Sequence, residues 1–266
     1  MNRLMGEKIV LDIMPDRARN PVTTSRKTIR ILEKLYDLEG ARVTELADAL
    51  GMNKSTVHNH LSTLEAEEIV IRDGNEYDIG LRLLEFGGYA RDNHLLSRVG
   101  ASEIERLANR TGELVNVVVE EFGKGVYIAC EKGDRAVELN QYPGYRRPLH
   151  VTASGKAILA HMPDDRIDEI VDRHGIEPAT ENSITDRSEL EDELRRVDER
   201  GFALDDEESV PGLRCVGASI LDSSGAVIGA ISVSAPTSRI TEAQFRDEIP
   251  DAVRSTANVI ELNINY

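Results

Sequence analysis

One stretch of the chain, TELADALGMNKSTVHNHLSTL, decides the fold of the N-terminal part and occupies residues 44–64. Its first part predicts a short helix that Thr44 can cap, with an inner face of Leu46, Ala47 and Leu50. Gly51 then permits the left-handed turn that ends this helix. Asn53 can cap a second helix, whose apolar residues recur at i, i+4 and i+7 as Val57, Leu61 and Leu64. Two helices around a glycine turn are typical of a helix-turn-helix.

The residues on either side extend this pattern. Upstream, a helix is predicted from Ser25 to Glu39-Gly40, with apolar residues at helical spacing, Ile29, Leu32, Leu35 and Tyr36. Downstream, residues 69–72 and 76–79 predict two short strands, joined by a hairpin turn at Asp73-Gly74-Asn75. A helix-turn-helix followed by a hairpin is a winged helix-turn-helix.

The outward face of the second helix suits contact with DNA. Because the apolar residues point inward, the residues left mostly outward are Lys54, Ser55, Thr56, His58, Asn59 and Ser62. These are short donors and acceptors that suit phosphates and base edges. The alternative is a solvated polar face, but such faces elsewhere in this chain are rich in Glu and Asp, whereas residues 53–64 contain neither. His60 lies near the inner edge and is predicted to pack rather than to contact a base.

Basic residues flank the predicted helix-turn-helix. In the wing, Arg72 and Asn75 are candidates for contact with the DNA backbone. Upstream, residues 17–30 contain no acid and five basic residues, Arg17, Arg19, Arg26, Lys27 and Arg30. The part of this segment up to Lys27 is either a flexible arm that follows a groove or a disordered leader.

The charge of the chain is strongly acidic but unevenly distributed. The 266 residues, enough for about two domains, carry 48 acidic and 32 basic side chains, a net charge of −16. Such a surface suits molar salt and indicates a halophilic source, and it would ordinarily argue against nucleic acid. Residues 1–91, however, carry 13 basic and 15 acidic groups, whereas residues 92–266 carry 19 and 33. The acidic excess therefore lies mostly outside the predicted DNA-binding part.

The sequence also bounds the compartment. No apolar run approaches the ~18 residues of a membrane span, and the N-terminus lacks the pattern of a signal peptide. We therefore expect a cytoplasmic protein. Cys130 and Cys215 lack the CxxC spacing of a metal site and are expected to be buried, reduced thiols.

The rest of the chain predicts a second domain of a different kind. Helices are expected at residues 81–89, with Gly87-Gly88 as a candidate joint, and at 95–110, 154–161, 164–174, 187–201 and 241–263, with Thr241 as the cap of the last. Strands are expected at residues 114–119, 125–130, 136–141, 215–221 and 226–234. This order predicts the α/β (α+β) class, with helices packed on a sheet.

Four segments are expected along the chain. They are a leader (1–21), a winged helix-turn-helix domain (22–82), a linker and dimerisation helix (83–96) and a second domain (97–266). The linker is more apolar than one helix needs, at Leu83, Leu84, Phe86 and Tyr89. A dimer contact would explain these residues, and so would docking against the wing.

Three further blocks carry a family resemblance. They are His150-Val-Thr-Ala-Ser-Gly-Lys-Ala157, Gly201-Phe-Ala-Leu-Asp-Asp-Glu-Glu208 with Gly212-Leu-Arg-Cys215, and Ala230-Ile-Ser-Val-Ser-Ala-Pro236. Together with the winged helix-turn-helix, their order and spacing over residues 22–264 resemble the IclR family of transcriptional regulators. The resemblance implies a GAF-like effector-binding domain, a dimer or dimer of dimers, and control of catabolic operons by small molecules.

The resemblance also implies the residues of the effector site. They are Leu139, Arg147, Ala153, Ser154, Asp205, Leu213, Cys215, Ser232 and Ser234. Physical arguments agree, because a helix start near Ser154 offers free N–H groups to a carboxylate, and Ser232 and Ser234 face the same side of a strand. The serines can instead be satisfied by a neighbouring strand or by water. Arg147 can pair with an anionic effector or point to solvent.

Other classes of function have weaker support. Gly155-Lys156 fails as a P-loop, because Ala157 follows the lysine and His150 stands where the first glycine should. We predict no catalytic residue, no cofactor and no metal site. The acidic residues 205–208 are interpreted as a solvated loop near the mouth of the site, with a divalent cation as the alternative. An enzyme or a protein-docking module with an accessory winged domain remains the alternative to a DNA-binding regulator.

Overall fold

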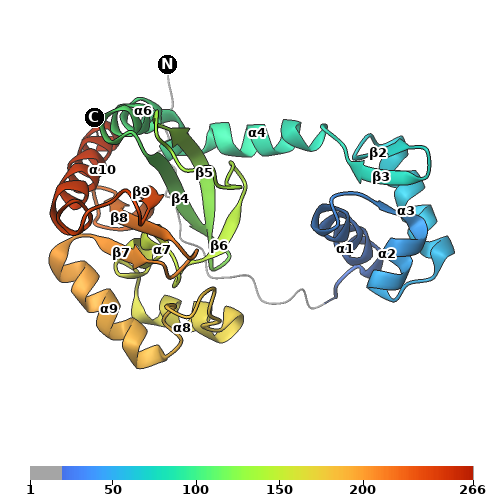
Figure 1. Cartoon of the computed structure of the whole chain (residues 1–266). Helices are drawn as coiled ribbons and strands as arrows, with labels where there is room; N and C mark the ends of the chain where they lie inside the picture. The colour runs from blue at the N-terminus through green and yellow to red at the C-terminus, as the bar shows by residue number, and fades with distance from the viewer. Residues whose placement is uncertain (1–19, 266) are drawn as a thin grey trace, which may run out of the picture. The chain divides into compact units, whose positions relative to one another are not determined.

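The computed structural model describes residues 20–265. Their contacts divide them into two compact units, residues 20–90 and residues 91–265, and the division falls within helix α4 (Leu83–Asn93; Figure 1). Gly87 and Gly88, the candidate joint, both lie inside this helix. Residues 1–19 of the predicted leader, with Arg17 and Arg19, lie outside the described residues.

The first unit is a winged helix-turn-helix. Its elements follow the order α1 (Thr23–Asp37), β1 (Ala41–Arg42), α2 (Val43–Leu50), α3 (Lys54–Ala66), β2 (Val70–Asp73) and β3 (Glu76–Ile79). The strands form an antiparallel sheet in the order β1-β3-β2, in which β2 and β3 are the predicted hairpin. Gly51 has a φ of 63°, which is the left-handed conformation that the turn between α2 and α3 requires.

Three details of this unit correct the predictions. The buried face of α1 consists of Ile31 and Leu35, whereas Ile29 and Tyr36 are exposed. Thr44 is not the cap of α2, which begins one residue earlier. The strand β1 was not expected, and its pairing with β3 adds a third strand to the wing. The start of α2 is set locally, because the N–H of Arg42 donates to Glu45 Oε2 at 2.7 Å, whereas β1 depends on its pairing with the distant β3.

The second unit is a six-stranded antiparallel sheet between two layers of helices. Its strands are β4 (Leu114–Glu121), β5 (Lys124–Lys132), β6 (Arg146–Pro148), β7 (Ala203–Asp206), β8 (Leu213–Leu221) and β9 (Val227–Pro236), in the order β6-β5-β4-β9-β8-β7. Its helices are α5 (Leu95–Val99), α6 (Ala101–Thr111), α7 (Ala153–Leu159), α8 (Asp164–His174), α9 (Arg187–Arg200), η1 (Gln244–Glu248) and α10 (Ile249–Asn265).

The two faces of this sheet pack against different helices. Helices α6 and α10 lie against one face of the sheet (Figure 1). Alternate strand residues such as Val117, Val216 and Ile231 pack on that side. The residues between them, such as Val118 and Ala230, pack with α7 and the helices beyond it. We refer to the second side as the α7 face. This alternation follows from the two-residue period of a strand.

Three expectations for the second unit are wrong or incomplete. Residues 136–141 form no strand, because β6 pairs with the edge of β5 in their place. The predicted helix 95–110 is two helices, α5 and α6, that meet at Gly100. The closing helix contains a π-turn, η1, which ends two residues before Pro250, and proline lacks the N–H of a regular helix. In residues 20–265 we find no helix with both the length and the apolar character that a membrane crossing demands.

Candidate DNA-binding and effector sites

Helix α3 presents a polar face of the predicted composition. Val57, Leu61 and Leu64 are buried against α1 and α2. The predicted contact residues Lys54, Ser55, His58, Asn59 and Ser62 are exposed, and Thr56 is partly buried. No acidic residue lies in the first turn of α3. The positive end of the helix dipole is therefore available to a phosphate.

A groove connects α3 with the wing. It has a volume of about 270 Å³, and the residues that line it include Arg42, Thr44, His58, Arg72 and Asn75. Arg72 is held in place, because its Nε donates to the carbonyl of Gly74 at 2.9 Å and its guanidinium lies over the ring of Tyr77. Arg42 and Thr44 were not among the predicted DNA contacts. Their position at the start of α2, where a helix presents free N–H groups, is the signal that could have found them.

His60 faces inward from α3. Its Nδ1 lies 2.8 Å from the hydroxyl of Thr28 on α1, and the side chain is partly buried. The structure therefore gives His60 the packing position that the sequence suggested.

Polar residues on the α7 face form two neighbouring rows across the sheet. The first polar row, on β7, β8 and β9, consists of Asp205, Cys215 and Ser234, which are paired in register. The second polar row, on β9, β4 and β5, consists of Ser232, Asn116 and Cys130, also paired in register. All but Cys130 are buried. The two rows bring together four of the predicted effector-site residues.

The start of α7 packs against Gly217, which lies next to the second polar row. A Cβ added at Gly217, which is paired with Ser232, would come within 2.7 Å of the backbone of Ala153 and Ser154. Only glycine allows this approach. The structure therefore places Ala153 and Ser154 beside the polar rows. Leu213 and the partly buried Leu139 belong to the apolar cluster that also contains Ala153 and Cys215.

Arg147 approaches the rows from the edge strand β6. Its Nη2 donates to the carbonyl of Ser209 at 2.5 Å, and its buried Nε has no hydrogen-bond partner among the described residues. Burial raises the pKa of the Cys215 thiol, an effect that the charge of Arg147 partly opposes. Ser209 also donates its hydroxyl to Asp205, so Arg147 and the first polar row share a neighbour in Ser209.

The acidic segment 205–208 is not a solvated loop, which corrects the sequence interpretation. Asp205 is fully buried, and its carboxylate accepts from the N–H groups of Glu208 and Ser209 and from the Ser209 hydroxyl at 2.6 Å. Burial raises the pKa of Asp205, while these hydrogen bonds lower it in part. Among the described residues, no three His, Cys, Asp or Glu side chains are grouped to hold a metal ion.

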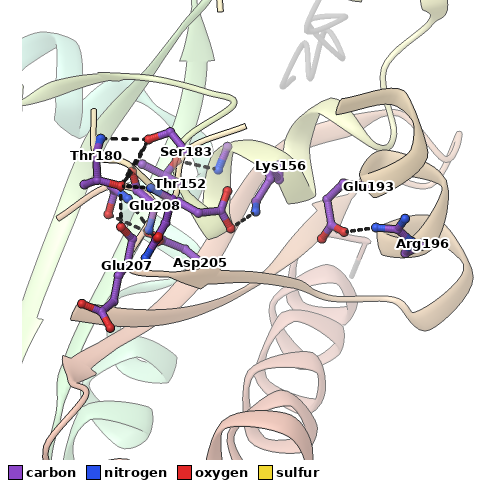
Figure 2. Close-up of polar contacts among 12 residues, drawn as sticks. Thr152, Lys156, Thr180, Ser183, Glu193, Arg196, Asp205, Glu207 and Glu208 are labelled. Carbon is purple, nitrogen blue, oxygen red and sulfur yellow. Dashed lines mark hydrogen bonds and ion pairs between the residues drawn. The ribbon is translucent and has the colours of Figure 1, made fainter. Parts of the chain in front are cut away.

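A buried ion pair lies beside Asp205. The Nζ of Lys156, on α7, donates to Glu208 Oε1 at 2.5 Å, and the two side chains are 1% and 12% exposed (Figure 2). Burial raises the pKa of Glu208 to about 7, an effect that Lys156 opposes. The backbone of this segment is held by the hydroxyls of Thr180 and Ser183. Lys156 belongs to the family block of residues 150–157, but neither its burial nor its pairing with Glu208 was predicted.

An exposed polar helix in a winged helix-turn-helix is typical of a DNA-binding regulator, and a buried polar cluster in an α+β domain is the kind of site that can bind a small molecule. The comparisons agree with this class. Residues 26–74 match the IclR helix-turn-helix domain, and residues 89–262 match the family described as bacterial transcriptional regulator IclR, C-terminal.

Two curated relatives and one solved structure illustrate the similarity. The chain is 32% identical over 260 residues to the probable HTH-type transcriptional regulator ArcR of Halobacterium salinarum, which covers 94% of this chain and 98% of the relative. It is 31% identical to the HTH-type transcriptional regulator KdgR of Escherichia coli, and the alignment covers 94% of this chain and 96% of KdgR. The crystal structure of Thermotoga maritima IclR superposes with a TM-score of 0.73 at 28% identity, and the match covers 92% of this chain and 99% of that one.

The chain belongs to the IclR family of transcriptional regulators. The recognised family and the fold class are thereby confirmed. The protein is a DNA-binding transcriptional regulator.

Proposed function

We propose that this regulator controls a catabolic operon by binding a near-palindromic operator through Lys54, Ser55, Thr56, His58, Asn59, Ser62 and Arg72. The observation that carries the proposal is the exposed, acid-free face of α3 in a chain of net charge −16. In a helix-turn-helix, the second helix enters the major groove. Lys54 then contacts a phosphate, and Asn59 contacts a base edge.

The operator-bound form is a homodimer or a tetramer of this chain. Four large apolar side chains near α4 support a self-contact, since Leu81, Leu84, Phe86 and Tyr89 are 80%, 70%, 55% and 76% exposed. An apolar patch of this kind commonly marks an interface. We retain 83–96 as the linker and dimerisation segment between a DNA-binding domain at 22–82 and a GAF-like domain at 97–266.

The effector is a small anionic metabolite bound at the two polar rows. Its contacts are Leu139, Arg147, Ala153, Ser154, Asp205, Leu213, Cys215, Ser232 and Ser234. The buried Nε of Arg147, without a partner among the described residues, supports the anionic character. The metabolite regulates DNA affinity through its different affinities for two arrangements of the paired winged domains.

The acidic composition fits a halophilic protein of the cytoplasm, where the chromosome lies. At ~1 M salt the Debye length is ~3 Å, so distant attraction to phosphates is nearly lost. Close hydrogen bonds and dimer geometry then provide most of the operator affinity.

The test is a footprint on the DNA upstream of the gene, in molar KCl with competitor DNA. We expect protection of a near-palindrome. Lys54→Ala should weaken binding to all sequences and reduce the salt slope by about 1, whereas Asn59→Ala should relax one operator position by ~1–3 kcal/mol. Lys34→Ala, on α1 where Lys34 pairs with Asp37, is the matched control. If both α3 variants bind the operator as the control does, α3 is not the helix that contacts DNA.

A further inference from the structure

Asn116 is a polar residue at the centre of an apolar strand. It lies between Val115 and Val117 in β4, and its side chain is 1% exposed. Neither its Nδ2 nor its Oδ1 has a hydrogen-bond partner among the residues that the structure describes. A buried amide without partners is destabilising, and proteins rarely retain one without a reason.

The position of Asn116 joins it to the effector site. It is the central member of the second polar row, paired with Ser232 on β9 and with Cys130 on β5. Val115 and Val117 pack on the opposite side of the sheet, so Asn116 faces α7. Directly opposed residues on neighbouring strands have Cβ atoms about 5 Å apart. A ligand that contacts Ser232 therefore lies within reach of the amide.

The chemistry of an amide restricts what can satisfy it. Asn presents two N–H donors and a carbonyl acceptor. A carboxylate has acceptors only, so it can pair with Nδ2 but leaves Oδ1 unpaired. A ligand that satisfies both atoms carries a hydrogen-bond donor, a hydroxyl or an amide N–H, beside its carboxylate.

Resting on the effector site proposed above, we propose that Asn116 is a specificity-determining residue that selects hydroxy- or amido-substituted organic acids. Acids of the same shape without the donor leave Oδ1 buried and unpaired, and they are rejected for that reason. A site built around a hydrogen bond discriminates strongly against an analogue that lacks the partner.

The test uses pairs of small acids that differ only in the donor: glycolate and acetate, lactate and propionate, oxamate and pyruvate. Binding of each acid to the full chain is measured by calorimetry in KCl. In the wild type we expect the donor-bearing acid of each pair to bind at least ~tenfold more tightly. In Asn116→Val this preference should fall below about twofold. The ligand-free variant should melt no lower than the wild type, because it loses an unpaired buried amide.

Several outcomes would overturn the inference. They are equal binding within the wild-type pairs, a preference retained in Asn116→Val, absence of binding by all three donor-bearing acids, and a lower melting temperature of the ligand-free variant. The last result would mean that Asn116 is structural.

Two serine variants separate this inference from the proposed site. Ser234→Ala removes a hydroxyl of the first polar row. Ser219→Ala is its matched control, because Ser219, on β8, lies on the same face of the sheet but contacts His161, which is outside the polar rows. Weaker binding in Ser234→Ala alone, with no effect of Asn116→Val, would leave the site intact and refute the inference. Unchanged binding in both serine variants would refute the site itself.

Discussion

Replacement of Lys156 by methionine should strongly destabilise the second unit. Lys156 is 1% exposed, and its ammonium lies 2.5 Å from the carboxylate of Glu208, which is 12% exposed (Figure 2). The other oxygen of Glu208, Oε2, has no hydrogen-bond partner among the described residues. Methionine retains most of the volume of the lysine chain but removes its charge. The carboxylate of Glu208 would then remain buried beside that of Asp205 without a compensating cation.

The magnitude follows from the energetics of buried ion pairs. Removal of one partner typically lowers the free energy of unfolding by ~3–5 kcal/mol, whereas replacement of both by apolar residues is often neutral. The double variant Lys156→Met/Glu208→Leu should therefore recover most of the loss. The hydrogen bonds that Thr180, Ser183 and Asp205 make with Glu208 involve its backbone and survive the substitution. The coupling energy in this cycle should reach ~3 kcal/mol.

The measurement is urea unfolding at constant KCl, followed by circular dichroism. Lys132→Met is the matched control, because Lys132 pairs with Glu138 at 2.6 Å but is 50% exposed; its effect should stay within ~1 kcal/mol. The loss in Lys156→Met should be smaller at about pH 5 than at about pH 8, since protonation of Glu208 removes the unpaired charge. A loss below ~1 kcal/mol at both pH values would refute the burial argument.

Three further predictions concern the same region. Gly155→Ala should destabilise the protein by ~3 kcal/mol in urea unfolding, because its Cβ would lie 2.1 Å from the carbonyl oxygen of Leu149; an unchanged midpoint would contradict this contact. Thr152→Ala should lower stability by ~1 kcal/mol in the same assay, since the Thr152 hydroxyl accepts from Gly155 N at 3.0 Å and caps α7. Glu208 has a folded-state pKa of about 7, raised from 4.5 by burial, so its contribution to stability is fully present below pH 4.5 and is lost as the pH rises through 7. The stability of the wild type should therefore fall relative to that of Glu208→Gln over this interval, and parallel pH profiles would show that Glu208 does not titrate there.

The helix-turn-helix was predictable because its determinants are local. Val57, Leu61 and Leu64 specify the buried stripe of α3 by spacing alone, and the structure buries all three. Gly51 supplies a backbone conformation that few other residues adopt easily. A stripe and a turn need no knowledge of distant segments, so the sequence was sufficient for both.

The errors arose where distant segments compete. In α1, Ile29 and Ile31 are both apolar, and only packing against α2 and α3 selects Ile31. Residues 136–141 have the composition of a strand, but β6 takes the free edge of β5. The burial of Lys156 depends on Glu208, which lies 52 residues away. Lys156 by itself does not indicate whether its ammonium group meets a buried carboxylate or solvent.

The two-residue period of the strands explains how one sheet serves two purposes. On β9, Ile231 and Val233 pack with α10, while Ser232 and Ser234 face α7. The same alternation on β4 places Val115 and Val117 in the core and Asn116 in the second polar row. Because the two sets point to opposite sides, substitutions at the polar positions can change which ligand binds while the apolar positions keep the register. An asparagine among valines is therefore a signal in the sequence itself, since β-propensity and burial both disfavour it there.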